Sequence, residues 1–128
     1  MARFLVHCHT AGRKHFDLRL VQEDRVRSWS MLKEPPLRTK DRRLAIERED
    51  IPLEALDLPK IEEEAFGAGR VRVWDGGEII EISGQPERLS LTLAGGKMQG
   101  RYELRRMRWY PGNRWLLEKS ATSGSNLT

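Results

Sequence analysis

The stretch HCHTAGRKHFDLRL, residues 7–20, decides the fold because polar and apolar residues alternate strictly along its second half. The polar set is His15, Asp17 and Arg19, and the apolar set between them is Phe16, Leu18 and Leu20. Successive side chains of a β-strand point to opposite faces. The stretch therefore predicts a strand with one wholly apolar face. Its other face carries an imidazole, a carboxylate and a guanidinium in a row.

Short segments of the same kind recur along the chain, and no segment has strong helical periodicity. They cover residues 4–6, 16–21, 26–31, 44–46, 70–74, 78–82, 88–93, 102–107 and 114–119. Asp75-Gly76-Gly77 predicts a hairpin turn between residues 70–74 and 78–82. Pro52 and Pro59 bracket a turn or short helix at 53–58. Regular short strands with Gly and Pro turns predict an all-β fold, a closed or nearly closed barrel or a sandwich, with short flanking helical turns.

The bulk properties bound the class of protein. With 128 residues, the chain predicts one domain over residues 1–119, followed by a tail, 120–128, with the composition of a flexible end. No apolar run approaches the roughly 20 residues that a membrane helix needs. The single cysteine, Cys8, cannot form an internal disulfide and suits a reducing cytosol, so we expect a cytoplasmic protein. A net charge of +4 favours a polyanionic partner.

The polar face of the opening stretch has two interpretations. His9, His15 and Asp17 form a ligand set suited to Mn, Fe or Zn that leaves coordination positions open for catalysis. The alternative is a solvated face on an edge strand. His7 points the same way as His9 and is expected near such a site or on the surface, whereas Cys8 points into the core.

A second candidate region lies near the C-terminus. Residues 97–119 contain seven basic and two acidic side chains, and Trp109 and Tyr110 directly follow Arg106 and Arg108. Arginines beside exposed aromatic rings suit a groove that follows a nucleic-acid backbone and stacks bases. The alternative is a solvated strand face with Trp109 packed into the core.

The order of several motifs resembles the 3′-phosphoesterase domain of bacterial DNA ligase D and its stand-alone relatives. The family signature H-x5-H-[YF]-D-[FL]-R-L matches residues 9–20, and S-W-x-x-P-K resembles residues 28–33. R-L-A matches 43–45, and E-D-H-P-L-E-Y resembles 49–55. Y-G-x-G followed by V-W-D resembles 66–69 and 73–75. The closing strands resemble 100–107 and 115–119, so the likeness extends from about residue 4 to residue 119.

The resemblance implies a small β-barrel with a metal site in its cavity. It implies a Mn-dependent activity that trims 3′-terminal ribonucleotides and removes 3′-phosphates at DNA ends. By resemblance, His9, His15 and Asp17 are the metal ligands. The phosphate-binding cations and a further active-site polar residue are, by the same resemblance, Arg19, Lys33, Arg43 and Glu49. Any ligase or polymerase would then act in trans on the same DNA ends.

The chain departs from the family pattern in the part expected to bind phosphate. The family's histidine and tyrosine in E-D-H-P-L-E-Y are replaced by Ile51 and Ala55. Neither replacement can donate a proton or a hydrogen bond. The family's I-P-E-G-E-Y-G is IEEEAFG here, residues 61–67, with three successive carboxylates at 62–64. Release of a 3′-phosphate is the activity that these changes affect most.

Three interpretations follow. The first is an active Mn-dependent 3′-end phosphoesterase with an altered pocket. The second is a metal-binding and DNA-end-binding module of the same family with weak or no catalysis. The third is a small β-barrel metalloenzyme that acts on another phosphoester or small molecule. The intact set of three ligands with Arg19 favours the first over the second.

Overall fold

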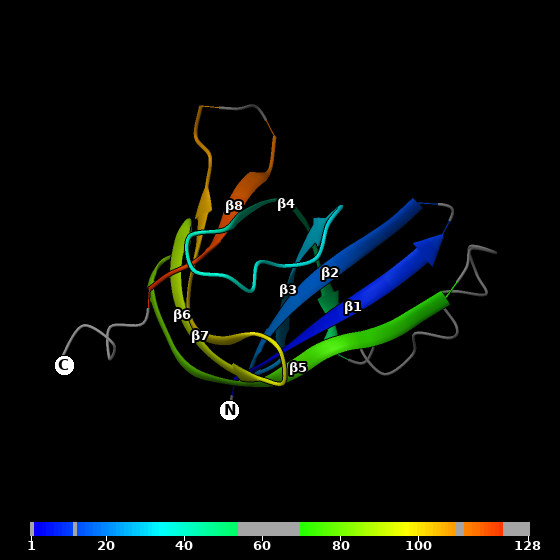
Figure 1. Ribbon diagram of the computed structural model, residues 1–128, viewed down its shortest axis with the longest axis horizontal. Helices are drawn as coiled ribbons and strands as arrows, with labels where there is room; N and C mark the ends of the chain where they lie inside the picture. Colours follow the sequence, from blue (N-terminus) through cyan, green and yellow to red (C-terminus); the bar gives the residue numbers. More distant parts are fainter. Residues whose placement is uncertain (1, 12, 54–69, 110–111, 122–128) are drawn as a thin grey trace.

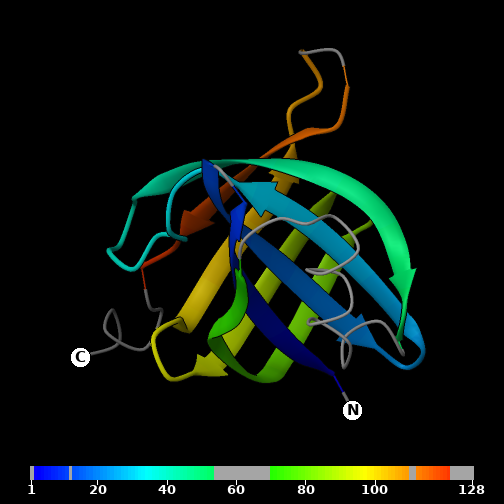
Figure 2. The same cartoon turned by 90° about the vertical axis from the view of Figure 1, so that its right-hand side faces the viewer.

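Eight antiparallel strands close into a barrel in the computed structural model, which describes residues 2–11, 13–53, 70–109 and 112–121 (Figures 1 and 2). The strands are β1 (Arg3–Ala11), β2 (Arg13–Gln22), β3 (Arg25–Met31), β4 (Arg42–Pro52), β5 (Arg70–Gln85), β6 (Arg88–Gly95), β7 (Gln99–Arg106) and β8 (Arg114–Lys119). Their order around the barrel is β1-β2-β3-β4-β8-β7-β6-β5. The described residues contain no α-helix, so the predicted all-β barrel is confirmed.

The barrel interior is an apolar core to which every strand contributes. Phe16, Leu18 and Leu20 of β2 are buried there, as the alternation predicts. The rings of Trp29 and Trp115 meet edge to face with centroids 5.3 Å apart, and Cys8 is buried in the same core. An eight-stranded barrel is just wide enough for side chains to fill it. Each buried Leu or Phe contributes about 1.5–3 kcal/mol relative to an exposed one.

The predicted hairpin at Asp75-Gly76-Gly77 is wrong, because β5 runs without a turn from Arg70 to Gln85. Both glycines lie within the strand, opposite Leu5 and Phe4 of β1. A Cβ on Gly77 would overlap the carbonyl oxygen of Ala94, so glycine permits a close approach to β6. Pairing with β1 and β6 keeps this segment extended and outweighs its local preference for a turn.

Asp75 instead holds the turn between β6 and β7. Its carboxylate accepts hydrogen bonds from the backbone N–H groups of Gly96 at 2.9 Å, Lys97 at 3.1 Å and Met98 at 2.7 Å. Asp75 is buried, and these bonds replace the water that it loses. Asp75, which the sequence places in a turn, therefore stabilises a different turn through its side chain.

The polar row of β2 lies on the outside of the barrel, so the expected metal site in the barrel cavity is wrong. The interior is instead occupied by apolar side chains such as Leu18 and Trp29, which are not exposed to solvent. The outer face of β1–β4 carries the polar residues of the opening stretch, and we call it the polar face. Among the described residues, no helix is long and apolar enough to cross a membrane.

Candidate metal and phosphate site

The pairing of β1 with β2 brings the three predicted ligands together. His9 lies directly opposite His15, and Asp17 follows two residues later on the same face. The Nδ1 atom of His9 lies 3.3 Å from Nε2 of His15, and that Nε2 lies 3.4 Å from Oδ2 of Asp17. The three ligand atoms all lie within 4.8 Å of one another.

This geometry fits a divalent ion. Nitrogen and oxygen donors about 2.1 Å from one ion, at tetrahedral or octahedral angles, lie about 3.0–3.4 Å apart. The two donor distances, 3.3 and 3.4 Å, fall in that range. Nδ1 is the His9 nitrogen that faces His15, whereas Nε2 of the same ring is buried and has no hydrogen-bond partner among the described residues. Two imidazoles and one carboxylate are a donor set that Mn, Fe and Zn accept.

Ser30 fixes the orientation of the Asp17 carboxylate. It lies opposite Asp17 in the pairing of β2 with β3. Its hydroxyl donates a hydrogen bond of 2.6 Å to Oδ1, so Oδ2 is the oxygen that remains turned toward His15. Arg48 of β4 donates from Nε to the Ser30 hydroxyl at 3.2 Å. A chain of hydrogen bonds thus extends from β4 through Ser30 to the candidate ligand.

Arg19 lies beside the three ligands, and two of its three side-chain nitrogens already donate hydrogen bonds. Nε donates to Nδ1 of His7 at 3.2 Å, and Nη1 donates to the Ser28 hydroxyl at 2.9 Å. Nη2 lies 3.7 Å from Oδ2 of Asp17. Burial, and next the positive charge of Arg19, lower the pKa of His7, whereas Asp17 raises it. A neutral His7 can accept the Arg19 hydrogen bond, so His7 and Ser28 position the guanidinium.

The other predicted phosphate-binding residues do not join this group. Lys33 is exposed after the end of β3 and has no hydrogen-bond or ion-pair partner among the described residues. Arg43 shares strand parity with buried Ala45 and donates to the backbone carbonyls of Glu34 and Arg42. Glu49 is exposed at the irregularity where β4 shifts register against β3. Their roles in phosphate binding stay predictions.

Sequence reasoning missed Arg48, which is linked to Asp17 by hydrogen bonds through the Ser30 hydroxyl. Its position depends on the pairing of Ser28 with Arg48, and this pairing adjoins the irregularity in β4. A cavity of about 460 Å³ separates Arg48 from His15. The even spacing of Ser28 and Ser30 on one strand was the available signal for the two serines. No local pattern placed Arg48 opposite them.

Ile51, which occupies the position of the family's histidine, packs in a small apolar cluster on the outer side of the barrel. Its neighbours are Val21 and Val26, both almost fully buried, and Leu5 and Leu53 pack against the same pair. The position thus contributes packing rather than a polar group. Ala55, the carboxylates at 62–64 and the motif at 67–69 lie outside the described residues.

The predicted nucleic-acid residues line a groove around the β7–β8 connection, and we call it the arginine groove. Trp109 is 93% exposed, so the alternative that packs it into the core is wrong. The segment that contains it projects beyond the barrel (Figures 1 and 2). A cavity of about 770 Å³ there is lined by Arg42, Glu87, Arg88, Arg105, Arg106, Met107, Arg108, Trp109 and Leu116. Arg88 lies directly opposite Arg105, an unfavourable pair of like charges that a polyanion would relieve.

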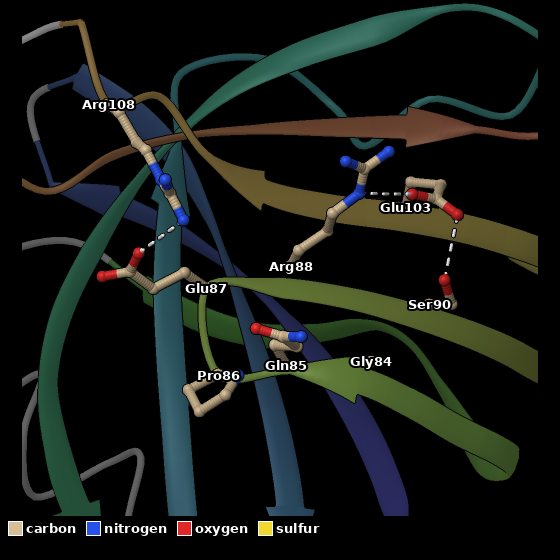
Figure 3. A pocket seen from close by; sticks show the side chains of 8 residues that line it. All are labelled: Gly84, Gln85, Pro86, Glu87, Arg88, Ser90, Glu103 and Arg108. Atoms are coloured by element: carbon tan, nitrogen blue, oxygen red, sulfur yellow. Dashed lines mark hydrogen bonds and ion pairs between the residues drawn. The ribbon is translucent and has the colours of Figure 1, made fainter.

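Glutamates compensate part of this charge. Glu87 accepts from Arg106 at 3.0 Å and lies 3.6 Å from Arg108. In the adjoining cavity of about 810 Å³, Arg88 points toward Glu103 at 3.9 Å, and Arg108 points toward Glu87 (Figure 3). Arg88, Arg106 and Arg108 are therefore paired with carboxylates before any partner binds.

The fold and the site together define a small β-barrel domain with a candidate metal centre, flanked by arginines, on its outer face. Residues 7–106 match the DNA Ligase D 3′-phosphoesterase domain family. The chain belongs to this family. It is 36% identical over 110 residues to the multifunctional non-homologous end joining protein LigD of Pseudomonas aeruginosa, covering 81% of this chain and 13% of that protein. It is 35% identical over 121 residues to the LigD protein of Mycobacterium bovis, covering 91% of this chain and 16% of that one.

Proposed function

We propose that the chain is a Mn-dependent 3′-end-processing phosphoesterase that removes ribonucleotides, phosphates or both from DNA 3′ ends in non-homologous end joining. The observation that carries this proposal is the group of His9, His15 and Asp17, with donor atoms 3.3 and 3.4 Å apart, beside Arg19. Membership of the 3′-phosphoesterase domain family supports the reaction class. The names of the LigD relatives support the repair process.

The chemistry requires hydrolysis of a phosphoester at the 3′ oxygen. Water forms a new P–O bond, the bond from phosphorus to the 3′ oxygen breaks, and that oxygen takes a proton and leaves as a 3′-OH. A divalent ion bound by the three ligands would polarise the phosphoryl group and lower the pKa of a coordinated water. Ser30 keeps one oxygen of Asp17 directed at the site, and Arg19 adds positive charge beside it.

A DNA strand can reach this site along the outer face of β4. Arg42, Leu44, Ile46 and Arg48 share one strand parity, and they extend over about 20 Å. Arg42 lines the arginine groove, whereas Ile46 and Arg48 line the cavity beside His15. We propose that DNA contacts Arg106, Arg108 and Trp109 in the groove and presents its 3′ end to the polar face. A ligase or polymerase would act on the same end afterwards.

A second candidate function is a metal- and DNA-end-binding module with weak or no catalysis. The packing of Ile51 against Val21 and Val26 favours it, because this apolar cluster replaces the family's polar residue. The two candidates agree on binding and differ only in turnover.

Labelled primer-templates that end in a ribonucleotide or a 3′-phosphate separate the two functions. With Mn, the wild-type protein is expected to shorten or dephosphorylate these ends, and His15→Ala is expected to remove the activity. Chelation of the metal should do the same. A protein that binds Mn and DNA ends but leaves both substrates intact would establish the binding module instead.

The isoleucine at position 51 is expected to affect the two proposed activities, phosphate release and ribonucleotide removal, to different extents. Loss of a polar group there is expected to slow release of a 3′-phosphate more than cleavage of a terminal ribonucleotide, which offers a vicinal 2′-OH and further contacts. Ile51→His combined with Ala55→Tyr is expected to raise phosphate release, and Ile51→Val serves as the control that keeps the packing. Rapid phosphate release by the wild type without ribonucleotide trimming would contradict this expectation.

A further inference from the structure

The cavity beside His15 has two kinds of wall. Arg13 and Arg48 supply positive charge, and His15 and Ser30 lie between them at the candidate metal site. Leu32 and Ile46 supply an apolar surface, and Leu32 is 64% exposed. The volume of about 460 Å³ is in the range of cavities that hold small molecules. Cationic and apolar side chains that line one cavity match a phosphate attached to a nucleoside.

The cations of this cavity differ from Arg19 in availability. Arg19 already donates to His7 and Ser28, and its side chain is 13% exposed. Arg48 is exposed and uses only Nε, toward Ser30, so its two terminal nitrogens have no partner among the described residues. Arg13 is exposed and has no hydrogen-bond or ion-pair partner among those residues. These two guanidinium groups are therefore free to bind a phosphate in the bidentate manner typical of arginine.

Ser30 connects this cavity to the metal site. The Ser30 hydroxyl accepts from Nε of Arg48 at 3.2 Å and donates to Oδ1 of Asp17 at 2.6 Å. The serine fixes the guanidinium of Arg48 and the carboxylate of Asp17 relative to each other. A phosphate held by Arg48 would thus lie next to the ligands that hold the ion.

We propose that this cavity binds the 3′-terminal nucleotide of the substrate. Arg48 binds its phosphate, Arg13 adds positive charge at the other end of the cavity, and Leu32 and Ile46 pack against its sugar or base. An apolar wall offers no hydrogen bonds to base edges, so the cavity accepts all four bases alike. The proposal rests on the proposed function and names the substrate-binding part of the same site.

Titration calorimetry with adenosine 5′-monophosphate and with inorganic phosphate tests the two walls separately. Arg48→Ala is expected to weaken binding of both probes at least about tenfold, because a hydrogen bond to a charged group is lost. Leu32→Ser is expected to weaken only the nucleotide, several-fold. Arg101→Ala is the matched control, since Arg101 is an exposed arginine of β7 that no part of this site uses. It should leave both affinities unchanged.

Each titration is run with and without Mn, so that the cavity and the proposed function can fail separately. Binding that depends on Arg48 without Mn, in a protein with no affinity for Mn, would support the cavity and contradict the metal-dependent function. Nucleotide binding that is equal in Arg48→Ala and Arg101→Ala would overturn the cavity, whatever the metal does. Failure of the wild type to bind the nucleotide in either condition would overturn it as well.

Discussion

The polar face and the arginine groove both concentrate arginines, but they hold them in different ways. On the polar face the hydrogen-bond partners are neutral: His7 and Ser28 accept from Arg19, and Ser30 accepts from Arg48, with one longer contact of 3.7 Å from Arg19 to Asp17. In the groove, Glu87 pairs directly with Arg106 and Arg108. Mediation by neutral groups keeps the positive charge and fixes its direction, which suits chemistry on a phosphate. Exposed ion pairs contribute about 0–1 kcal/mol each, so a polyanion can exchange them at little cost.

This difference predicts large, local effects on the polar face and small, salt-sensitive ones in the groove. The largest is expected for Asp17→Ala, which removes the anionic ligand. Loss of a group behind a ligand commonly costs 10- to 100-fold in metal affinity, so loss of the ligand should exceed about 100-fold. Calorimetry with Mn measures it, and Asp41→Ala, an exposed carboxylate next to β4, is the control. Equal Mn affinities for the wild type, Asp17→Ala and His15→Ala would show that the three residues hold no metal.

Ser30→Ala is expected to have the next largest effect. The variant removes the donor that fixes Oδ1 of Asp17 and leaves all three candidate ligands in place. Mn affinity should fall by about 10- to 100-fold. Ser83→Ala, at an exposed position of β5, controls for the loss of a serine hydroxyl. If Ser30→Ala binds Mn as tightly as Ser83→Ala, the orientation of Asp17 does not depend on this bond.

The sequence predicts a region well where its structure depends on residues close together in the chain, and poorly where it depends on pairing between distant strands. Alternation along β2 predicts both its faces, because side-chain direction in a strand is a local property. The same alternation predicts that His15 and Asp17 share a face, and the adjoining β1 supplies His9 across a short connection. Here local pattern and tertiary structure agree.

Prediction failed where long-range pairing decided the outcome. Asp75-Gly76-Gly77 has the composition of a turn, yet β1 and β6 hold it extended. The polar row was expected in the barrel cavity, but it is the apolar face of β2 that turns inward and joins Trp29 and Trp115 in the core. Arg48 reaches the site only through the register of β3 with β4, which an irregularity shifts. No pattern within one strand encodes that register.

The arginine groove is tested by replacing Arg106 and Arg108 together with alanine. The logarithm of the affinity for duplex DNA should fall by about 0.9 per log unit of salt for each phosphate contact. The double variant loses up to about two such contacts, so its salt dependence should be correspondingly less steep. Affinity at low salt should drop by about tenfold. Arg72→Ala with Arg101→Ala removes the same charge from exposed positions elsewhere. An unchanged slope in the Arg106 and Arg108 variant would assign DNA to another surface.

The smallest effect, and the one that most directly separates the two regions, is expected for Glu87→Gln. This substitution keeps the shape of the side chain and removes the charge that competes with phosphates for Arg106 and Arg108. Because the exposed pairs are worth about 0–1 kcal/mol, DNA affinity at low salt should rise by up to about fivefold. Mn affinity should not change, since Glu87 lines the groove and not the cavity beside His15. Glu81→Gln, at an exposed position of β5, is the control for the charge change. DNA affinity that stays level or falls in Glu87→Gln would mean that the ion pairs maintain the shape of the groove and do not compete with phosphates for its arginines.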